Sequence, residues 1–206
     1  MKLHNFDKII CLNLEKRKDR KSSCVDIFKN LGLDVEFFNG IDGSLLTNTG
    51  KIKKGHMGCC LSHRRIFERI LENNWNTTLI LEDDVEFHLD VHQLFEQFYN
   101  EVPVDWQMLY FGGNHCKTTQ IMVSEHVHKL YQTFTTHCYA IKKDIIPMLL
   151  EEFNEKNIYN LEVDVHLASI QKKQPCYGFI PHLAWQRSDY SDIEKCIVDY
   201  KFLEIP

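Results

Sequence analysis

The sequence contains no run of about 20 apolar residues, the length that a membrane-spanning helix requires. Near the N-terminus, the apolar residues 9–12 are interrupted by Asn13 and followed by Glu15, which makes this run too short and too polar for a signal peptide. We therefore expect a chain without a membrane span that is made and kept in the cytoplasm.

The sequence also lacks an excess of positive charge and any Cys-x-x-Cys pair. Its formal net charge is −5, whereas general nucleic-acid-binding proteins carry a basic face, so we expect no nucleic-acid partner. Several of the eight cysteines stand inside apolar runs, which is typical of buried free thiols in a reducing compartment. His-Cys neighbours occur at 115/116 and 137/138, but the absence of a second pair at ligand spacing argues against structural zinc.

The overall composition is typical of a soluble, globular protein. With 206 residues, 44% of them hydrophobic and 26% charged, the chain has the size and the apolar content for one domain over residues 1–206. Predicted strands and helices alternate, which favours an α/β sandwich with a mostly parallel central sheet. We expect strands near residues 8–14, 35–38, 77–81, 106–111 and 133–141. We expect helices ending at Gly32 and near residues 55–72, 88–99, 145–153 and 161–170. Residues 44–54 read as a loop, and 115–129 as a hairpin or a mobile loop.

Three consecutive carboxylates, Glu82, Asp83 and Asp84, follow the predicted strand at residues 77–81. Adjacent acids repel one another, and a hard cation such as Mg²⁺ or Mn²⁺ offsets that repulsion. In an extended segment Glu82 and Asp84 point to one face and Asp83 to the other, so the predicted metal ligands are Glu82 and Asp84. The alternative is a solvated acidic turn.

Two further segments suit a phosphate-bearing ligand. The basic residues 15–21 stand at the start of a helix, where guanidinium groups and free amides both favour anions. Gly40 and Gly43 flank Asp42 after the second predicted strand, which allows close backbone approach and offers a carboxylate to a base or ribose hydroxyl. A solvated helix face and an ordinary turn are the respective alternatives.

The helix predicted from residue 55 begins with two glycines, Gly55 and Gly58, which would let its start approach a ligand. His63 falls within the apolar stripe of this helix. We interpret it as a buried, hydrogen-bonded core histidine rather than as a ligand contact.

Together these stretches resemble glycosyltransferase family 25, which includes bacterial lipooligosaccharide galactosyltransferases and the procollagen galactosyltransferases. The motifs that carry the resemblance are, in chain order, Asn13-Leu14-x-x-Arg17-x-Asp19-Arg20, Asn39-Gly40-Ile41-Asp42-Gly43, Gly58-Cys59-x-Leu61-Ser62-His63, Leu81-Glu82-Asp83-Asp84-Val85, His137-x-Tyr139-x-Ile141, Val163-Asp164 and Gln186-x-x-Ser188-x-Ser191-Asp192-Ile193. The chain departs from the family at His56-Met57, where an acidic and an aliphatic residue are frequent. The missing signal peptide argues against the secretory role of the procollagen enzymes.

The resemblance implies a GT-A type nucleotide-binding fold, a UDP-sugar donor, dependence on Mn²⁺ (or Mg²⁺), and inversion at the anomeric carbon. The sugar is expected to be galactose or glucose, and the acceptor a glycan or a glycosylated protein. Glu82 and Asp84 are the expected metal ligands, with His182 as a third ligand or, alternatively, a structural hydrogen-bonding residue. The residues expected to hold the donor are Asn13, Leu14, Arg17, Arg20, Gly40, Asp42, Gly43, Gly58, Ser62, Asp83 and Gln186.

Asp164 is the expected general base, because it matches the Val-Asp motif and is flanked by Val163 and Val165, which should limit its solvation and raise its basicity. The alternatives for this role are Glu162, Asp189 and Asp192. Two other functions remain open: a catalytically silent UDP-sugar-binding scaffold, and a different metal-dependent enzyme such as a phosphohydrolase built around the Asp-Asp pair. Neither the acceptor nor the oligomeric state follows from the sequence.

Overall fold

The computed structural model describes residues 1–47 and 50–204. Its helices are η1 (Leu3–Asn5), α1 (Lys18–Asn30), η2 (Gly43–Leu45), α2 (Lys54–Asn73), α3 (Val91–Tyr99), η3 (Lys143–Ile145), α4 (Ile146–Glu152), α5 (Val163–Gln171) and η4 (Lys201–Leu203). Its strands are β1 (Lys8–Asn13), β2 (Glu36–Asn39), β3 (Thr77–Glu82), β4 (Val85–Phe87), β5 (Met108–Tyr110), β6 (Asn114–His115), β7 (Ile121–Met122), β8 (Val127–Lys129), β9 (Thr133–Phe134), β10 (Cys138–Lys142), β11 (Cys176–Phe179), β12 (Ala184–Gln186), β13 (Asp189–Tyr190) and β14 (Ile197–Val198).

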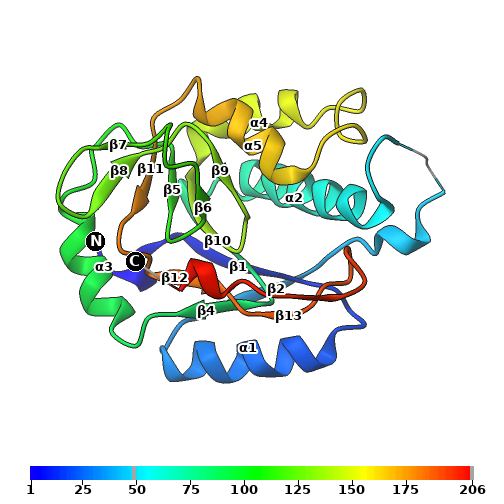
Figure 1. Ribbon diagram of the computed structural model, residues 1–206, viewed down its shortest axis with the longest axis horizontal. Coiled ribbons are helices and arrows are strands. Elements are labelled where there is room, and N and C mark those ends of the chain that lie inside the picture. The colour runs from blue at the N-terminus through cyan, green and yellow to red at the C-terminus, as the bar shows by residue number, and fades with distance from the viewer. Residues whose placement is uncertain (48–49, 205–206) are drawn as a thin grey trace.

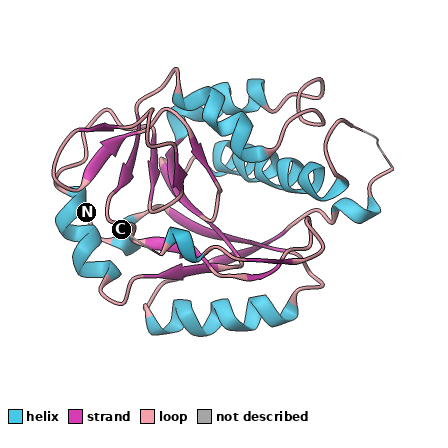
Figure 2. Ribbon diagram, in the orientation of Figure 1, coloured by secondary structure: helices cyan, strands magenta, loops and turns pink. Residues whose placement is uncertain are grey.

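An eight-stranded sheet in the order β2-β1-β3-β10-β5-β11-β8-β7 forms the centre of the molecule (Figures 1 and 2). Two strands, β10 and β8, run opposite to the others, because each is antiparallel to both of its neighbours. The predicted α/β sandwich with a mostly parallel central sheet is therefore confirmed. Since β1, β2 and β3 are parallel, their carboxyl ends meet at one edge of the sheet, where ligand crevices form in such folds.

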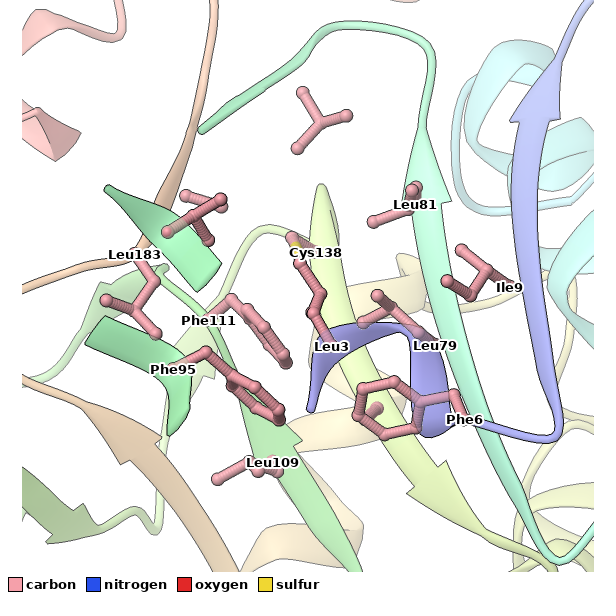
Figure 3. Close-up of a cluster of buried hydrophobic side chains, with 14 of the residues drawn as sticks. Leu3, Phe6, Ile9, Leu79, Leu81, Phe95, Leu109, Phe111, Cys138 and Leu183 are labelled. Atoms are coloured by element: carbon pink, nitrogen blue, oxygen red, sulfur yellow. The ribbon is translucent and has the colours of Figure 1, made fainter. Parts of the chain in front are cut away.

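The two faces of the sheet bury separate hydrophobic cores. Along β1, Ile9 and Cys11 point into one core and Ile10 into the other, as the alternation of a strand dictates. The first core packs against α1 and α3, and the second against α2, α4 and α5. Figure 3 shows the first core, where Phe95 and Phe111 stack with ring centroids 5.1 Å apart. Burying one such side chain contributes about 1.5–3 kcal/mol.

The structure corrects one predicted strand and clarifies a loop. Residues 133–141 are not continuous, because Thr135 adopts a positive φ of 75° and separates β9, which pairs with β6, from β10 in the main sheet. Residues 115–129 contain the β7–β8 hairpin, the first of the two alternatives. The loop at 44–54 begins with η2, and its residues 48 and 49 lie outside the described residues.

The helices lie where the sequence pattern predicts them, but α3 begins at Val91, three residues after the predicted start, and α5 begins at Val163, two residues after it. Gly32 follows α1 with a φ of 60°, and Asn74 closes α2 in the left-handed region, as a terminating glycine or asparagine does. In α5, Glu162 is the N-cap residue and Asp164 lies in the first turn. Within residues 1–47 and 50–204, no helix combines the length and the apolar character needed to cross a bilayer.

Candidate active site

A cavity of about 740 Å³ opens at the carboxyl ends of β1, β2 and β3. It is closed on its far side by α5 and by the segment after β12. The predicted site residues that line it are Leu14, Arg17, Arg20, Gly40, Asp42, Gly43, Ser62, Glu82, Asp83, Asp84, Asp164 and Gln186. The structure thus brings together most residues that were predicted from segments far apart in the chain.

The three consecutive acids do not alternate as an extended strand requires. Strand β3 ends at Glu82, and Asp83 and Asp84 form the turn to β4. Both aspartates accept hydrogen bonds from Nη1 of Arg20, at 2.8 Å for Asp83 and 3.0 Å for Asp84. The prediction that Asp83 faces away from Asp84 is therefore wrong, because the strand geometry that supported it stops one residue earlier.

Glu82 lies in a different environment from the two aspartates. Its Oε1 accepts a hydrogen bond from the hydroxyl of Thr136 at 2.5 Å and lies 3.4 Å from Nε2 of His63. Although burial alone raises the pKa of Glu82, the hydrogen bonds from His63 and Thr136 and the charge of His63 hold that pKa below its ordinary value. Glu82 is therefore an ionised carboxylate at neutral pH.

Asp84 is 5% exposed, and burial together with the negative charge of Glu82 raises its pKa to about 7. Its Oδ2 accepts hydrogen bonds from Arg20 and from Nε2 of Gln186 at 3.0 Å. Its Oδ1 is buried and has no hydrogen-bond partner in the described part of the chain. Since a buried carboxylate oxygen needs a partner, this atom fits a divalent cation that takes oxygen ligands.

The two arginines are neither solvated nor free. Their side chains are only 14% exposed for Arg17 and 11% for Arg20. Arg17 pairs with Asp192 at 2.6 Å, and Arg20 donates from Nε to Asp189 at 3.1 Å. Arg17 and Arg20 are therefore not part of a solvated helix face, whereas Lys18 and Lys21 of the same basic run are exposed. Both cations line the cavity and pair with carboxylates of the C-terminal segment, in addition to Asp19 for Arg17 and to Asp83 and Asp84 for Arg20.

Asn13 and Gly58 were predicted to contact the donor, but the structure gives them supporting positions. Asn13 is 3% exposed and donates from Nδ2 to Oδ2 of Asp83 at 2.7 Å, which fixes that carboxylate. A Cβ on Gly58 would lie 2.5 Å from the carbonyl oxygen of Ile41, so this glycine lets α2 approach the loop after β2. Neither Asn13 nor Gly58 is among the described residues that line the cavity, so direct contact with the donor stays a prediction for both.

The loop after β2 is held by α2 and by Lys16. Ser62 accepts a hydrogen bond from the amide of Ile41 at 2.8 Å, which anchors the loop from the helix side. Asp42 accepts from Lys16 at 2.7 Å and from the amide of Ser44, and these bonds lower its pKa to about 2. Asp42 is thus a fixed, charged acceptor at the rim of the cavity.

His182 does not lie with the carboxylates. Its Nδ1 donates to the carbonyl oxygen of Leu203 at 2.9 Å, and its ring packs edge-on against His115. It is absent from the described residues that line the cavity. The structure therefore gives His182 the structural hydrogen bond that was the alternative to metal ligation, and metal ligation by His182 stays an untested prediction.

Asp164 lies on the cavity wall at the start of α5. Its Oδ1 accepts from the amide of Val165 at 2.8 Å, and its Oδ2 accepts from the amide of Thr135 at 3.3 Å. Among the residues that the structure describes, no cation pairs with Asp164. By contrast, Asp189 and Asp192 pair with arginines, and Glu162 lies 3.3 Å from His56. Of the four candidate bases, Asp164 alone is fixed by backbone amides without an opposing charge.

Sequence reasoning missed the groups that hold Glu82. Thr136 gave no signal, because a single threonine has no spacing that identifies it. His63 was correctly predicted as a buried, hydrogen-bonded core histidine, and its Nδ1 lies 2.8 Å from the hydroxyl of Tyr139. Its proximity to Glu82 could not be read from the chain, since 19 positions separate the two residues.

Comparison with known proteins relates this geometry to one family. The family model described as Glycosyltransferase family 25 (LPS biosynthesis protein) matches residues 6–169. A "Glycosyltransferase 25 family member" of Anopheles gambiae is 28% identical over 86% of this chain and 34% of that protein. "Procollagen galactosyltransferase 2" of Homo sapiens is 28% identical over 52% of this chain and 21% of that protein.

The chain thus spans about a third of the length of these curated relatives, or less. Among solved structures, the "Crystal Structure of A197 from STIV" superimposes with a TM-score of 0.52 and 11% identity, covering 93% of each chain. That likeness concerns the fold alone.

Proposed function

Because the chain belongs to glycosyltransferase family 25, we propose that it transfers a hexose from a UDP-sugar to an acceptor hydroxyl, with inversion at the anomeric carbon and with Mn²⁺ as cofactor. Galactose and glucose are the expected sugars, and the acceptor is a glycan or a glycosylated protein. The observation that carries this proposal is the unpartnered, buried Oδ1 of Asp84 on the wall of a cavity that also holds two arginines and Asp164.

In this proposal Asp84 and Glu82 hold the divalent ion, and Asp83 stays with Arg20. The ion supplies Lewis-acid stabilisation of the charge that develops on the departing diphosphate. The chain contributes the ligands in a fixed arrangement, because Gln186 and Arg20 orient Asp84 while Thr136 and His63 orient Glu82. A site that is ordered before binding has little to reorganise during the reaction.

The two arginines bind the diphosphate in exchange for their present partners. Asp189 and Asp192 are 32% and 22% exposed, so their pairs with Arg20 and Arg17 are partly solvated and contribute about 0–1 kcal/mol each. A doubly charged diphosphate offers stronger acceptors to the same guanidinium groups. Donor binding would therefore displace the carboxylates of the C-terminal segment.

Asp164 takes the proton of the acceptor hydroxyl. An alcohol is a poor nucleophile at neutral pH, so direct displacement needs a carboxylate that is positioned and available. The amides of Val165 and Thr135 hold this carboxylate on the cavity wall, and no described cation neutralises it. The proton passes from the hydroxyl to Asp164 as the oxygen attacks the anomeric carbon and the diphosphate leaves.

A panel of UDP-sugars with Mn²⁺, assayed for UDP release with and without glycan acceptors, tests the function. One donor is expected to give acceptor-stimulated UDP release, with a product of opposite anomeric configuration. Binding of UDP and Mn²⁺ without turnover would instead support a silent scaffold, and release of inorganic phosphate from phosphomonoesters would support a phosphohydrolase. A product of retained configuration would contradict the single displacement.

A further inference from the structure

We infer that Cys59, His63 and Glu82 form a zinc site on the inner wall of the cavity, a site that goes beyond the proposed transfer reaction. Within the described residues, one ligand atom of each lies within 4.8 Å of the others. Tetrahedral bonds of about 2.0–2.3 Å place ligand atoms about 3.3–3.8 Å apart, so side-chain movements of about 1 Å complete the site.

The positions of the three residues follow from secondary structure. Cys59 and His63 stand four residues apart on α2, and this spacing places two side chains on one face of a helix, as in helical metal sites. Glu82, the last residue of β3, approaches that face from the sheet, with its Oε1 3.4 Å from Nε2 of His63. The neighbouring His-Cys pairs at 115/116 and 137/138 do not belong to this set, which combines a helix and a strand.

The chemistry of the set suits zinc better than manganese. A thiolate, a neutral imidazole and a carboxylate together carry two negative charges, which one Zn²⁺ cancels in a buried position. Thiolate and imidazole are ligands that zinc accepts, whereas Mn²⁺ prefers oxygen. The all-oxygen pair of Asp84 and Glu82 and the mixed set around Cys59 thus select different ions.

Tyr139 orients the histidine for this role. Its hydroxyl lies 2.8 Å from Nδ1 of His63, and the two rings stack with centroids 5.9 Å apart. On ion binding, Nδ1 would keep its proton and donate to Tyr139, while Nε2, which donates to Glu82 in the ion-free chain, would give up its proton and offer its lone pair to the ion. Such an outer partner fixes the tautomer and the ring orientation of a metal-binding histidine.

The site has an open side. His63 is fully buried, whereas Cys59 and Glu82 line the cavity, so a zinc ion reaches them from the cavity and keeps one position for water or a ligand. Because Glu82 is also a ligand in the proposed Mn²⁺ site, zinc occupancy would withdraw it and inhibit transfer. Zinc binding itself requires neither donor nor acceptor.

The test uses the metal-free chain titrated with Co²⁺, which reports a thiolate ligand through a sulfur-to-cobalt charge-transfer band. One equivalent of Co²⁺ is expected to produce the band, and Zn²⁺ to abolish it by displacement. Cys59→Ala should remove the band and weaken Zn²⁺ binding more than about 100-fold. This loss of affinity is larger than the loss that follows removal of a residue that only hydrogen-bonds a metal ligand. The matched control Cys196→Ala changes an exposed cysteine and should leave the band unchanged.

A second pair of variants separates ligation from folding. Tyr139→Phe should weaken Zn²⁺ binding about 10-fold, because it removes the partner of His63. Tyr110 stacks on Tyr139 with ring centroids 5.7 Å apart, but its hydroxyl accepts a hydrogen bond from Gln171. Because Tyr110 is not the partner of His63, Tyr110→Phe should leave zinc affinity unchanged. Absence of a thiolate band in the native chain, or its survival in Cys59→Ala, would overturn the site. These measurements involve no sugar donor, so failure of the transferase assay would leave them intact.

Discussion

The inner and outer walls of the cavity hold their charges in different ways. The inner wall, at the ends of β1 and β3, carries Asp83 and Asp84, whose side chains are 11% and 8% exposed and each accept hydrogen bonds from two other side chains. The outer wall, formed by the segment after β12, carries Asp189 and Asp192, which are 32% and 22% exposed. Figure 1 shows this orange-to-red segment running back past the sheet toward the β1–α1 connection.

This difference in burial separates the fixed carboxylates of the inner wall from the exchangeable ion pairs of the outer wall. Buried carboxylates lose their hydration and depend on protein groups or an ion, so the loss of a partner on the inner wall is costly. The half-buried pairs of the outer wall can be replaced by water or by a phosphate at little cost. We therefore expect changes on the inner wall to affect catalysis and stability, and changes on the outer wall to affect donor affinity.

The largest effect is expected from Asp84→Asn, on the inner wall. Removing the metal ligand should lower transfer by about 10³-fold or more, since an aligned charge-stabilising group contributes at this scale. Steady-state UDP release with saturating Mn²⁺ measures it, and Glu86→Gln, a change on the neighbouring strand β4, is the control. Full activity of the native chain in excess chelator would contradict the metal requirement.

The same variant should be more stable than the native chain when no ion is bound. The pKa of Asp84 in the folded chain is raised to about 7, above its value in the unfolded chain. Ionised Asp84 therefore destabilises the fold: this loss of stability is absent below the unfolded-chain pKa and grows as pH rises toward 7. The gain in Tm for Asp84→Asn should be small near pH 4 and largest above pH 7. Thermal unfolding in chelator across this range measures it, and a loss of Tm at pH 8 would contradict the burial argument.

Asp164→Asn should lower transfer about 10²-fold or more while leaving the affinity for UDP and Mn²⁺ near native, because the amide cannot accept the proton. Calorimetric titration with UDP and single-turnover transfer separate the two quantities. Glu162→Gln is the matched control, and its activity should be close to native. An active Asp164→Asn would move the role to Glu162, Asp189 or Asp192.

The two arginines provide the most direct comparison of the walls. Arg20→Ala leaves Asp83 and Asp84 buried without their counter-charge and should cost about 3 kcal/mol of unfolding free energy. Arg17→Ala breaks the pair with Asp19 on α1 and the outer-wall pairs with Asp189 and Asp192, and it should cost no more than about 1 kcal/mol while raising the donor KM about 10-fold. Denaturant unfolding and donor kinetics measure both, and Arg20→Lys should recover part of the stability. Equal stability losses would remove the distinction between the walls.

The smallest effect is expected from Asp192→Asn. Asp192 pairs with Arg17 in the absence of donor, so the donor must displace it. Neutralising Asp192 should therefore lower the donor KM by about 2- to 5-fold, which corresponds to the free energy of one partly solvated ion pair. Asp199→Asn, in the same segment but bonded to Ser188 rather than to an arginine, should leave KM unchanged. A raised KM in Asp192→Asn would show that this carboxylate supports the donor site instead of competing with the donor.

Much of the arrangement was predictable because local rules produce it. The apolar strands at residues 8–14 and 77–81, the helices between them and the acids at the carboxyl end of a strand indicated an α/β fold with a crevice at that edge. Neither the approach of Asn13 to Asp83 nor the close contact of Gly58 with Ile41 was predictable, because 70 and 17 positions respectively separate the partners along the chain.

The sequence by itself determined the class of fold and the set of polar groups near the sheet edge, because side-chain periodicity and strand ends are properties of neighbouring residues. Only the tertiary structure decided how those groups pair. Arg20 joins Asp83 to Asp84, Glu82 turns toward His63, and His182 bonds Leu203 outside the cavity. Each of these contacts depends on packing between elements that are far apart in the sequence. Burial makes an unpaired charge or polar group costly, so each group bonds a partner that the packing brings within reach.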